Sequence, residues 1–150
     1  METKEQREDR WRGVLHPLGL APPPGARGCE RLDDAVAREH GGAWVELGAT
    51  RYAAPVRAAI AALHAAGVCH GDLHRGNIVV VEGRAQFIDF ERTAYVSRLR
   101  PGAREFAEAL ESVEPWAYGQ PSTAAGLLAA ERVLPFVYRF QTGRPEDRQK

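Results

Sequence analysis

The sequence has little that would direct this chain to a membrane, to the outside of the cell or to nucleic acid. None of its 150 residues belongs to an apolar run of about 18 residues, so we expect no membrane span. Cysteine is rare: Cys29 and Cys69 do not make a disulfide framework, and they fit a reducing compartment. The 20 basic and 20 acidic side chains balance, so we expect no strong attraction to nucleic acid or to anionic lipid.

The N-terminus lacks the apolar segment of a secretory signal, because residues 1–10 are mostly charged. We therefore expect the protein in the cytoplasm, with the nucleus as the alternative. The length suits one domain, and a hydrophobic content of 44% suits one modest core. We divide the chain into a charged and proline-rich segment at 1–28, a folded domain at 29–142 and a polar tail at 143–150.

Helices dominate the expected secondary structure. The clearest lies at 55–66, where Val56, Ile60 and Leu63 fall on one face and Gly67 can end the helix. Weaker apolar periodicity predicts further helices at 30–38, 103–113 and 122–140. Together with two predicted strands, these helices indicate an α+β fold that is mainly α-helical.

The two predicted strands, 78–81 and 85–88, form a hairpin around Gly83. Symmetric pairing about Gly83 places Asn77 opposite Asp89. Because side chains alternate along a strand, these two would then share one face at the open end of the hairpin. The oxygen atoms of an amide and a carboxylate suit a hard cation such as Mg²⁺.

A third oxygen group, the carboxylate of Asp72, comes five residues before Asn77. A carboxylate beside a metal site can orient a hydroxyl and accept its proton. An amide and a carboxylate for Mg²⁺, with a separate carboxylate for the nucleophile, make a layout for phosphoryl transfer.

The segment H-G-D-L-H-R-G-N at 70–77 resembles the catalytic loop of the protein kinase-like superfamily, H-R-D-L-x-x-x-N, and Ile88-Asp89-Phe90 resembles its metal-binding D-F-G. The His-Gly-Asp variant, with His74 where protein kinases usually carry lysine, is also similar to aminoglycoside phosphotransferases and atypical kinases. The resemblance implies a kinase-like C-lobe that uses ATP and Mg²⁺. It makes Asp72 the catalytic base, and it places His70, which would brace the loop, and His74 in the same catalytic loop. Asn77 and Asp89 would hold the metal and the nucleotide.

The chain departs from the superfamily in its N-terminal part. It has no G-x-G-x-x-G, and its only lysines, Lys4 and Lys150, do not match the strand lysine that anchors the phosphates. Glu91 replaces the glycine of D-F-G. We therefore expect a C-lobe over 29–142 whose N-lobe is absent or vestigial, or is supplied by a partner chain.

Three functions are compatible with these residues. The first is phosphate transfer from ATP to a hydroxyl, for which we expect protein Ser or Thr, although the motif does not separate protein from small-molecule acceptors. The second is a catalytically impaired pseudokinase or binding module. The third is a zinc-dependent hydrolase, in which His70, Asp72 and His74 would be the ligands.

Overall fold

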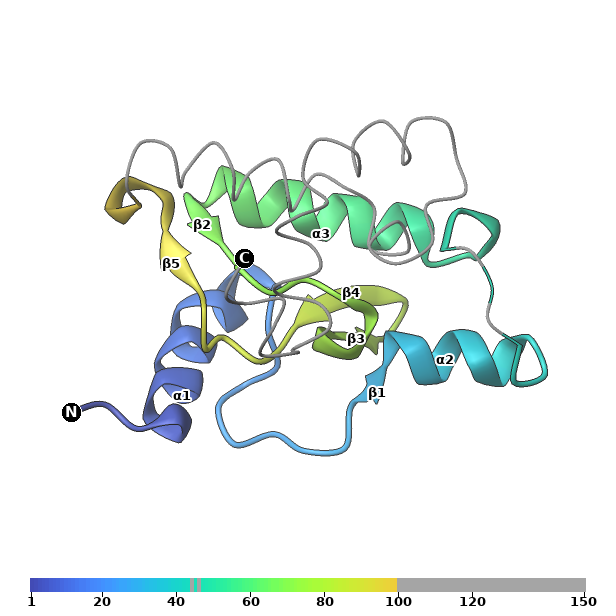
Figure 1. The fold of residues 1–150 in the computed structure, drawn as a ribbon, viewed down its shortest axis with the longest axis horizontal. Coiled ribbons are helices and arrows are strands. Elements are labelled where there is room, and N and C mark those ends of the chain that lie inside the picture. The colour runs from blue at the N-terminus through green and yellow to red at the C-terminus, as the bar shows by residue number, and fades with distance from the viewer. Residues whose placement is uncertain (44, 46, 100–150) are drawn as a thin grey trace, which may run out of the picture.

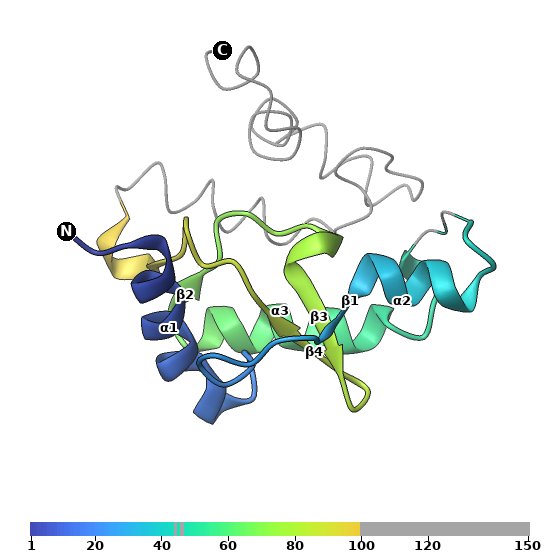
Figure 2. The ribbon, with the colours of Figure 1, turned by 90° about the horizontal axis from the view of Figure 1, so that it is seen from below.

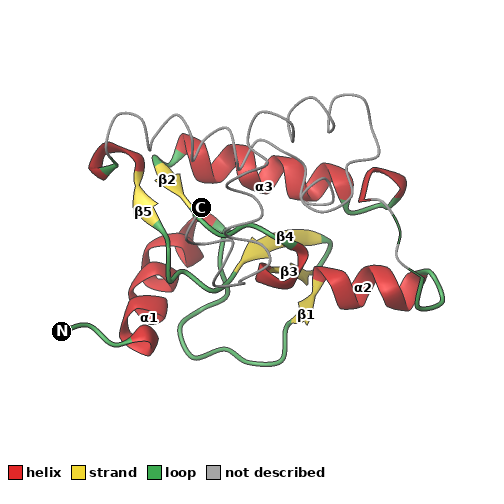
Figure 3. Ribbon diagram, in the orientation of Figure 1, coloured by secondary structure: helices red, strands yellow, loops and turns green. Residues whose placement is uncertain are grey.

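The computed structural model describes residues 1–43, 45 and 47–99. These residues form an α+β fold, as predicted, with three α-helices and two small sheets (Figures 1 and 3). The helices are α1 (Lys4–Leu15), α2 (Leu32–Glu39) and α3 (Ala53–Ala65). The first sheet has the order β1 (Glu30–Arg31), β3 (Ile78–Val81) and β4 (Arg84–Phe87), and the second pairs β2 (Val68–Cys69) with β5 (Ala94–Tyr95). The helices predicted at 103–113 and 122–140, and the tail, lie outside the described residues.

The predicted helices at 55–66 and 30–38 correspond to α3 and α2 with shifted ends. α3 begins at Ala53, and its buried face carries Val56 and Leu63, as the periodicity predicted. α2 begins only at Leu32, because Glu30 and Arg31 pair with β3 as strand β1. None of the helices in the described part of the chain has the length and apolar composition that crossing a membrane requires.

A single hydrophobic core joins the helices to the first sheet. In Figure 2, α3 runs along the sheet, with α1 at one end and α2 at the other. Trp11 and Leu15 of α1 are buried in this core together with Leu63 of α3 and Phe87 of β4. The division of the chain at residue 28 stays a prediction, but the core includes residues on both sides of it.

The predicted hairpin is present, but its predicted register is wrong by one residue. Val81 pairs with Arg84, and the turn contains only Glu82 and Gly83. Both turn residues have positive φ, 51° and 79°, which is typical of the two-residue turn that matches the twist of the strands. The predicted three-residue turn is centred on Gly83, whereas in the structure Gly83 is the second residue of a two-residue turn.

We expect Glu82→Asn to stabilise the protein by about 0.5–1 kcal/mol, because asparagine tolerates the left-handed conformation better than glutamate does. Urea unfolding at constant m-value would measure the gain. Glu82→Ala is the control, since it removes the same charge and leaves the backbone strain in place. An equal gain in both variants would attribute the effect to charge and contradict the prediction.

Candidate functional site

The catalytic-loop motif lies between β2 and β3, and His70 holds it against the end of the hairpin. The His70 ring is fully buried. Its Nε2–H donates to the carbonyl oxygen of Ile88 at 2.8 Å, and its Nδ1 accepts from the backbone N–H of Asp72 at 3.2 Å. His70 thus joins the loop to the residue before Asp89, which suits a bracing role. Because both ring nitrogens are engaged inside the protein, His70 has no lone pair to offer zinc.

Gly71 lets the loop pass against the backbone that follows Asp89. Its φ is +89°, a region that residues with side chains rarely adopt. A Cβ at this position would collide with the carbonyl oxygen of Arg92 and lie 3.0 Å from its carbonyl carbon. The close approach of the two segments therefore requires glycine at position 71.

Asp72 and Asn77 lie side by side at the end of the loop. The Asn77 side chain is buried, and its Nδ2 donates to the backbone oxygen of Asp72 at 2.9 Å and more weakly to Asp72 Oδ2 at 3.4 Å. The other carboxylate oxygen, Oδ1, is buried and has no hydrogen-bond partner among the described residues. A buried acceptor without a donor is costly, so this oxygen is suited to receive a hydrogen bond from a ligand.

Burial dominates the electrostatics of the loop. It raises the pKa of Asp72, and the nearby carboxylate of Asp89 raises it further, while His74, His70 and Arg92 act in the opposite direction. Burial also lowers the pKa of His74. His74 Nδ1 accepts the backbone N–H of Gly76 at 3.1 Å at the start of the short 3-10 turn Arg75–Asn77, so its contact in the structure is with the backbone.

The position of Asp89 is not set by strand pairing with Asn77, contrary to the prediction from the sequence. The backbone N–H of Ile88 donates to the carbonyl oxygen of Asn77 at 3.0 Å, so the residue opposite Asn77 is Ile88. β4 ends at Phe87, and Asp89 has φ 62°, so the alternation of a strand does not extend to it. The prediction that Asn77 and Asp89 form an opposed pair on one face is therefore wrong. Asp89 is nevertheless close enough to Asp72 and His74 to influence both electrostatically.

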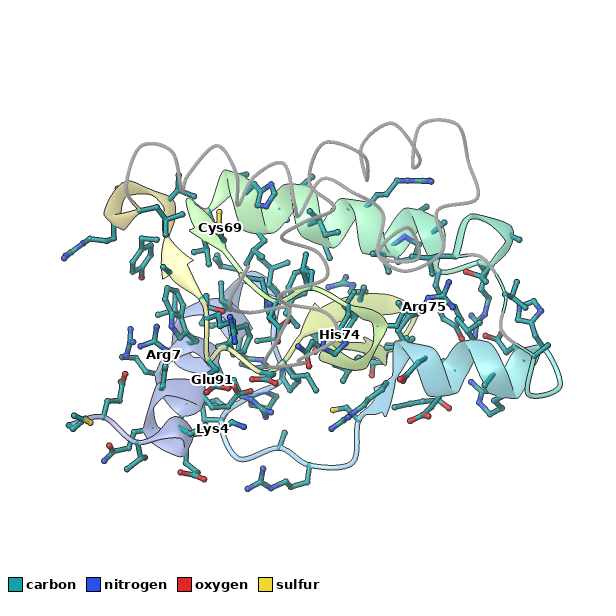
Figure 4. The ribbon with its side chains drawn as sticks, in the orientation of Figure 1. Lys4, Arg7, Cys69, His74, Arg75 and Glu91 are labelled. Atoms are coloured by element: carbon teal, nitrogen blue, oxygen red, sulfur yellow. The ribbon has the colours of Figure 1, made fainter. Side chains whose placement is uncertain are left out.

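A cleft of about 400 Å³ opens beside Asp89 between α1 and the segment that leads to β1. It carries charges of both signs and is lined by Lys4, Glu5, Glu8, Asp9, Arg12, Gly25, Arg27, Arg31, Ile88 and Asp89. Figure 4 shows Lys4 and Arg7 on α1, beside the segment that carries Glu91. Lys4 does not match the strand lysine of the superfamily in sequence, but the docking of α1 brings it to the same cleft as Asp89.

The oxygen groups present suit Mg²⁺ better than zinc. Asn77 offers an amide oxygen and Asp89 a carboxylate, whereas zinc prefers nitrogen and sulfur ligands. Within residues 1–43, 45 and 47–99 no three His, Cys, Asp or Glu side chains are grouped as a metal site. Mg²⁺ characteristically binds to one or two protein side chains and completes its shell with phosphate oxygens and water.

Three residues that bind the backbone of the site lie outside the sequence motif and were not predicted. Glu8 of α1 accepts the backbone N–H groups of Asp89 and Phe90, and Arg7 donates to backbone oxygens of the same segment. Thr93 Oγ1 donates to the carbonyl oxygen of His70 at 2.8 Å. The capping box of Thr3 and Gln6 marks the start of α1 and was readable in the sequence, but it does not indicate where the helix docks.

The sequence of the chain also matches a known protein family. A family model described as APH, phosphotransferase enzyme family, matches residues 13–100, which is more than half of the 150 residues. The matched region includes the whole of the loop at 70–77 and the segment with Asp89, and it begins within α1, after Glu8. No curated protein matches the chain.

Proposed function

Because this chain belongs to the phosphotransferase enzyme family, we propose that it transfers the γ-phosphate of ATP to a hydroxyl group, with Mg²⁺ as cofactor. The observation that carries the proposal is the buried Oδ1 of Asp72, which has no donor among the described residues. In this role the acceptor hydroxyl donates to Asp72 Oδ1 and loses its proton to that carboxylate as the phosphate is transferred.

Asn77 and Asp89 are the residues that we propose to hold Mg²⁺. The Nδ2 of Asn77 is bonded to Asp72, which leaves its Oδ1 for the metal. When bound, Mg²⁺ neutralises charge on the phosphate oxygens. Lys4, Arg27 and Arg31 line the cleft beside Asp89 and supply positive charge for the phosphates, in place of the glycine-rich loop and strand lysine that the sequence lacks.

We keep a Ser or Thr hydroxyl of a protein as the first acceptor to test, and a hydroxylated small molecule as the second. The deciding experiment incubates the purified full chain with γ-labelled ATP and Mg²⁺, once with a protein acceptor panel and once with aminoglycosides and other polyols. Asp72→Asn is the control for contaminating kinases. No label transfer above this control with either acceptor set would overturn the proposal.

The pH dependence of transfer offers a second test. Asp72 must be ionised to accept a proton, and burial raises its pKa, so activity should fall with decreasing pH at a higher pH than an ordinary Asp would give. The acidic limb of kcat/KM should therefore lie above the ordinary Asp pKa of about 3.9.

His74→Asn tests whether the acidic limb of kcat/KM reports the ionisation of Asp72. Asparagine can still accept the Gly76 N–H, but it removes the imidazole whose electrostatic effect lowers the Asp72 pKa, so the acidic limb should move further upward. A limb at or below the ordinary Asp range in both proteins would contradict the assignment of Asp72 as the base.

The alternative is a binding module that does not transfer phosphate. It is favoured by the sequence, which has no glycine-rich loop, and a partner chain that supplies an N-lobe belongs to the same alternative. Nucleotide binding that requires Mg²⁺, without transfer to any acceptor, would support this function. Co-purification of a chain that restores transfer would support the partner.

A further inference from the structure

The helix α1 binds both the N–H groups and the carbonyl groups of the turn that contains Asp89. We propose that Glu8 is a positioning residue, which fixes the backbone of Asp89 and thereby the direction of its carboxylate. This inference rests on the proposed role of Asp89 as a metal ligand. It extends the site to a part of the chain that precedes the region matched by the family model, residues 13–100.

Glu8 binds the two consecutive N–H groups of the turn. Its Oε1 accepts the N–H of Phe90 at 2.8 Å, and its Oε2 accepts the N–H of Asp89 at 3.2 Å. Arg12 Nε donates to the same Oε2 at 3.0 Å, which fixes the carboxylate within the helix. Hydrogen bonds to an ionised carboxylate are about twice as strong as neutral ones, so this contact is well suited to restrain the turn.

Arg7, one residue earlier, binds the carbonyl groups of the same turn. Its Nε donates to the Phe90 oxygen at 3.3 Å, and its Nη2 donates to the Thr93 oxygen at 2.9 Å. Thr93 in turn donates to the carbonyl oxygen of His70. The helix is therefore connected to the metal-binding turn directly and to the catalytic loop through a single residue.

The turn needs such support because of its conformation. Asp89 has φ 62°, a sparsely populated conformation for a residue with a side chain, which persists only when neighbouring groups hold it. α1 is a firm support, because Trp11 and Leu15 bury it in the core. Without Glu8, the two N–H groups would lose their acceptor and Asp89 could relax to a commoner conformation with its carboxylate in another direction.

The first measurement is amide hydrogen exchange of Asp89 and Phe90 in the metal-free full chain, followed by NMR. Glu8→Gln should increase the exchange rate of both amides by at least about 10-fold, since loss of a charge-assisted bond changes the opening equilibrium by that order. Glu5→Gln is the matched control. It removes the same charge from the same helix and cleft, but Glu5 is exposed and its carboxylate makes no hydrogen bond to the turn, so exchange should not change.

The second measurement is the Mg²⁺ affinity in the presence of ADP, by isothermal titration calorimetry. Glu8→Gln should weaken Mg²⁺ binding by about 10-fold, because Asp89 is no longer held in place. If Glu8 acted only through its negative charge in the cleft, Glu5→Gln would remove the same charge from the same cleft and would weaken Mg²⁺ binding to the same extent. The positioning role instead predicts that Glu8→Gln weakens Mg²⁺ binding and Glu5→Gln does not.

The outcomes separate this inference from the proposed function. Unchanged exchange at Phe90 in a folded Glu8→Gln protein overturns the contact, and faster exchange with unchanged Mg²⁺ affinity overturns the positioning role. If Glu8→Gln does not fold, Arg7→Gln provides the same two measurements through the carbonyl side of the turn. If the wild-type chain binds Mg²⁺·ADP but transfers no phosphate, the proposed function fails. The positioning role of Glu8 can still be tested by amide exchange and Mg²⁺ affinity. If the wild type binds no Mg²⁺, the positioning role is overturned as well.

Discussion

Asp72→Asn is expected to lower the rate of phosphate transfer by about 10²–10⁴-fold, the usual contribution of a general base. Asparagine has nearly the shape of aspartate and can still accept the weak hydrogen bond from Asn77 Nδ2. It cannot accept a proton from the acceptor hydroxyl. The loss should therefore appear in kcat, with little change in the affinity for Mg²⁺·ATP.

The same substitution should leave the melting temperature unchanged or raise it. Burial raises the Asp72 pKa, so between its ordinary and its raised pKa the folded state binds more protons than the unfolded state. The stability of the wild type therefore decreases as the pH rises through that window, and neutral asparagine removes this loss. Thermal unfolding at neutral pH checks the expectation. A lower melting temperature together with lost activity would indicate that Asp72 has a structural role.

Gly71→Ala is expected to lower the free energy of unfolding by about 2–4 kcal/mol and to abolish transfer. Two effects add here: the strain of a side chain at φ +89° and the collision of its Cβ with the Arg92 backbone. The segments that carry Asp72 and Asp89 must separate to relieve the collision. Chemical denaturation and the transfer assay measure the two consequences.

Gly67→Ala is the matched control for Gly71→Ala. Gly67 has a similar φ of +76°, but nothing lies within 4 Å of a Cβ at that position. Gly67→Ala should lower the free energy of unfolding only by the backbone strain, about 1–2 kcal/mol, and should leave phosphate transfer intact. Equal losses of stability and activity in both variants would show that the approach to Arg92 does not set the requirement for glycine.

Local signals predicted the elements that position the site. The apolar spacing of Val56 and Leu63 gave α3, and the apolar segments either side of Gly83 gave the hairpin. The loop at 70–77 was recognisable because its chemistry depends on residues close together in the sequence. The hairpin register could not be predicted from the sequence, because Gly83 fits either a two-residue or a three-residue turn. The left-handed conformation of Glu82 in the structure decides between them.

The part of the site that escaped prediction depends on tertiary contacts. Nothing in the spacing of Arg7 and Glu8 distinguishes them from other charged residues of an exposed helix. Their hydrogen bonds to the Asp89 turn bind backbone groups, which carry no side-chain pattern in the sequence. The same limit applies to Lys4, whose place beside Asp89 follows from the docking of α1 and not from its position in the chain.

The docking of α1 also determines when the site can form during folding. Glu8 and its partners Asp89 and Phe90 are 81 and 82 residues apart, whereas the hairpin pairs only neighbouring strands. Contacts over such separations require closure of a large loop, so they form late compared with local ones. On the ribosome, α1 is synthesised before the Asp89 turn and has no turn to hold until the chain has emerged beyond residue 90. The Asp89 turn is thus completed by a helix that was synthesised well before it, after α3 and the hairpin have formed.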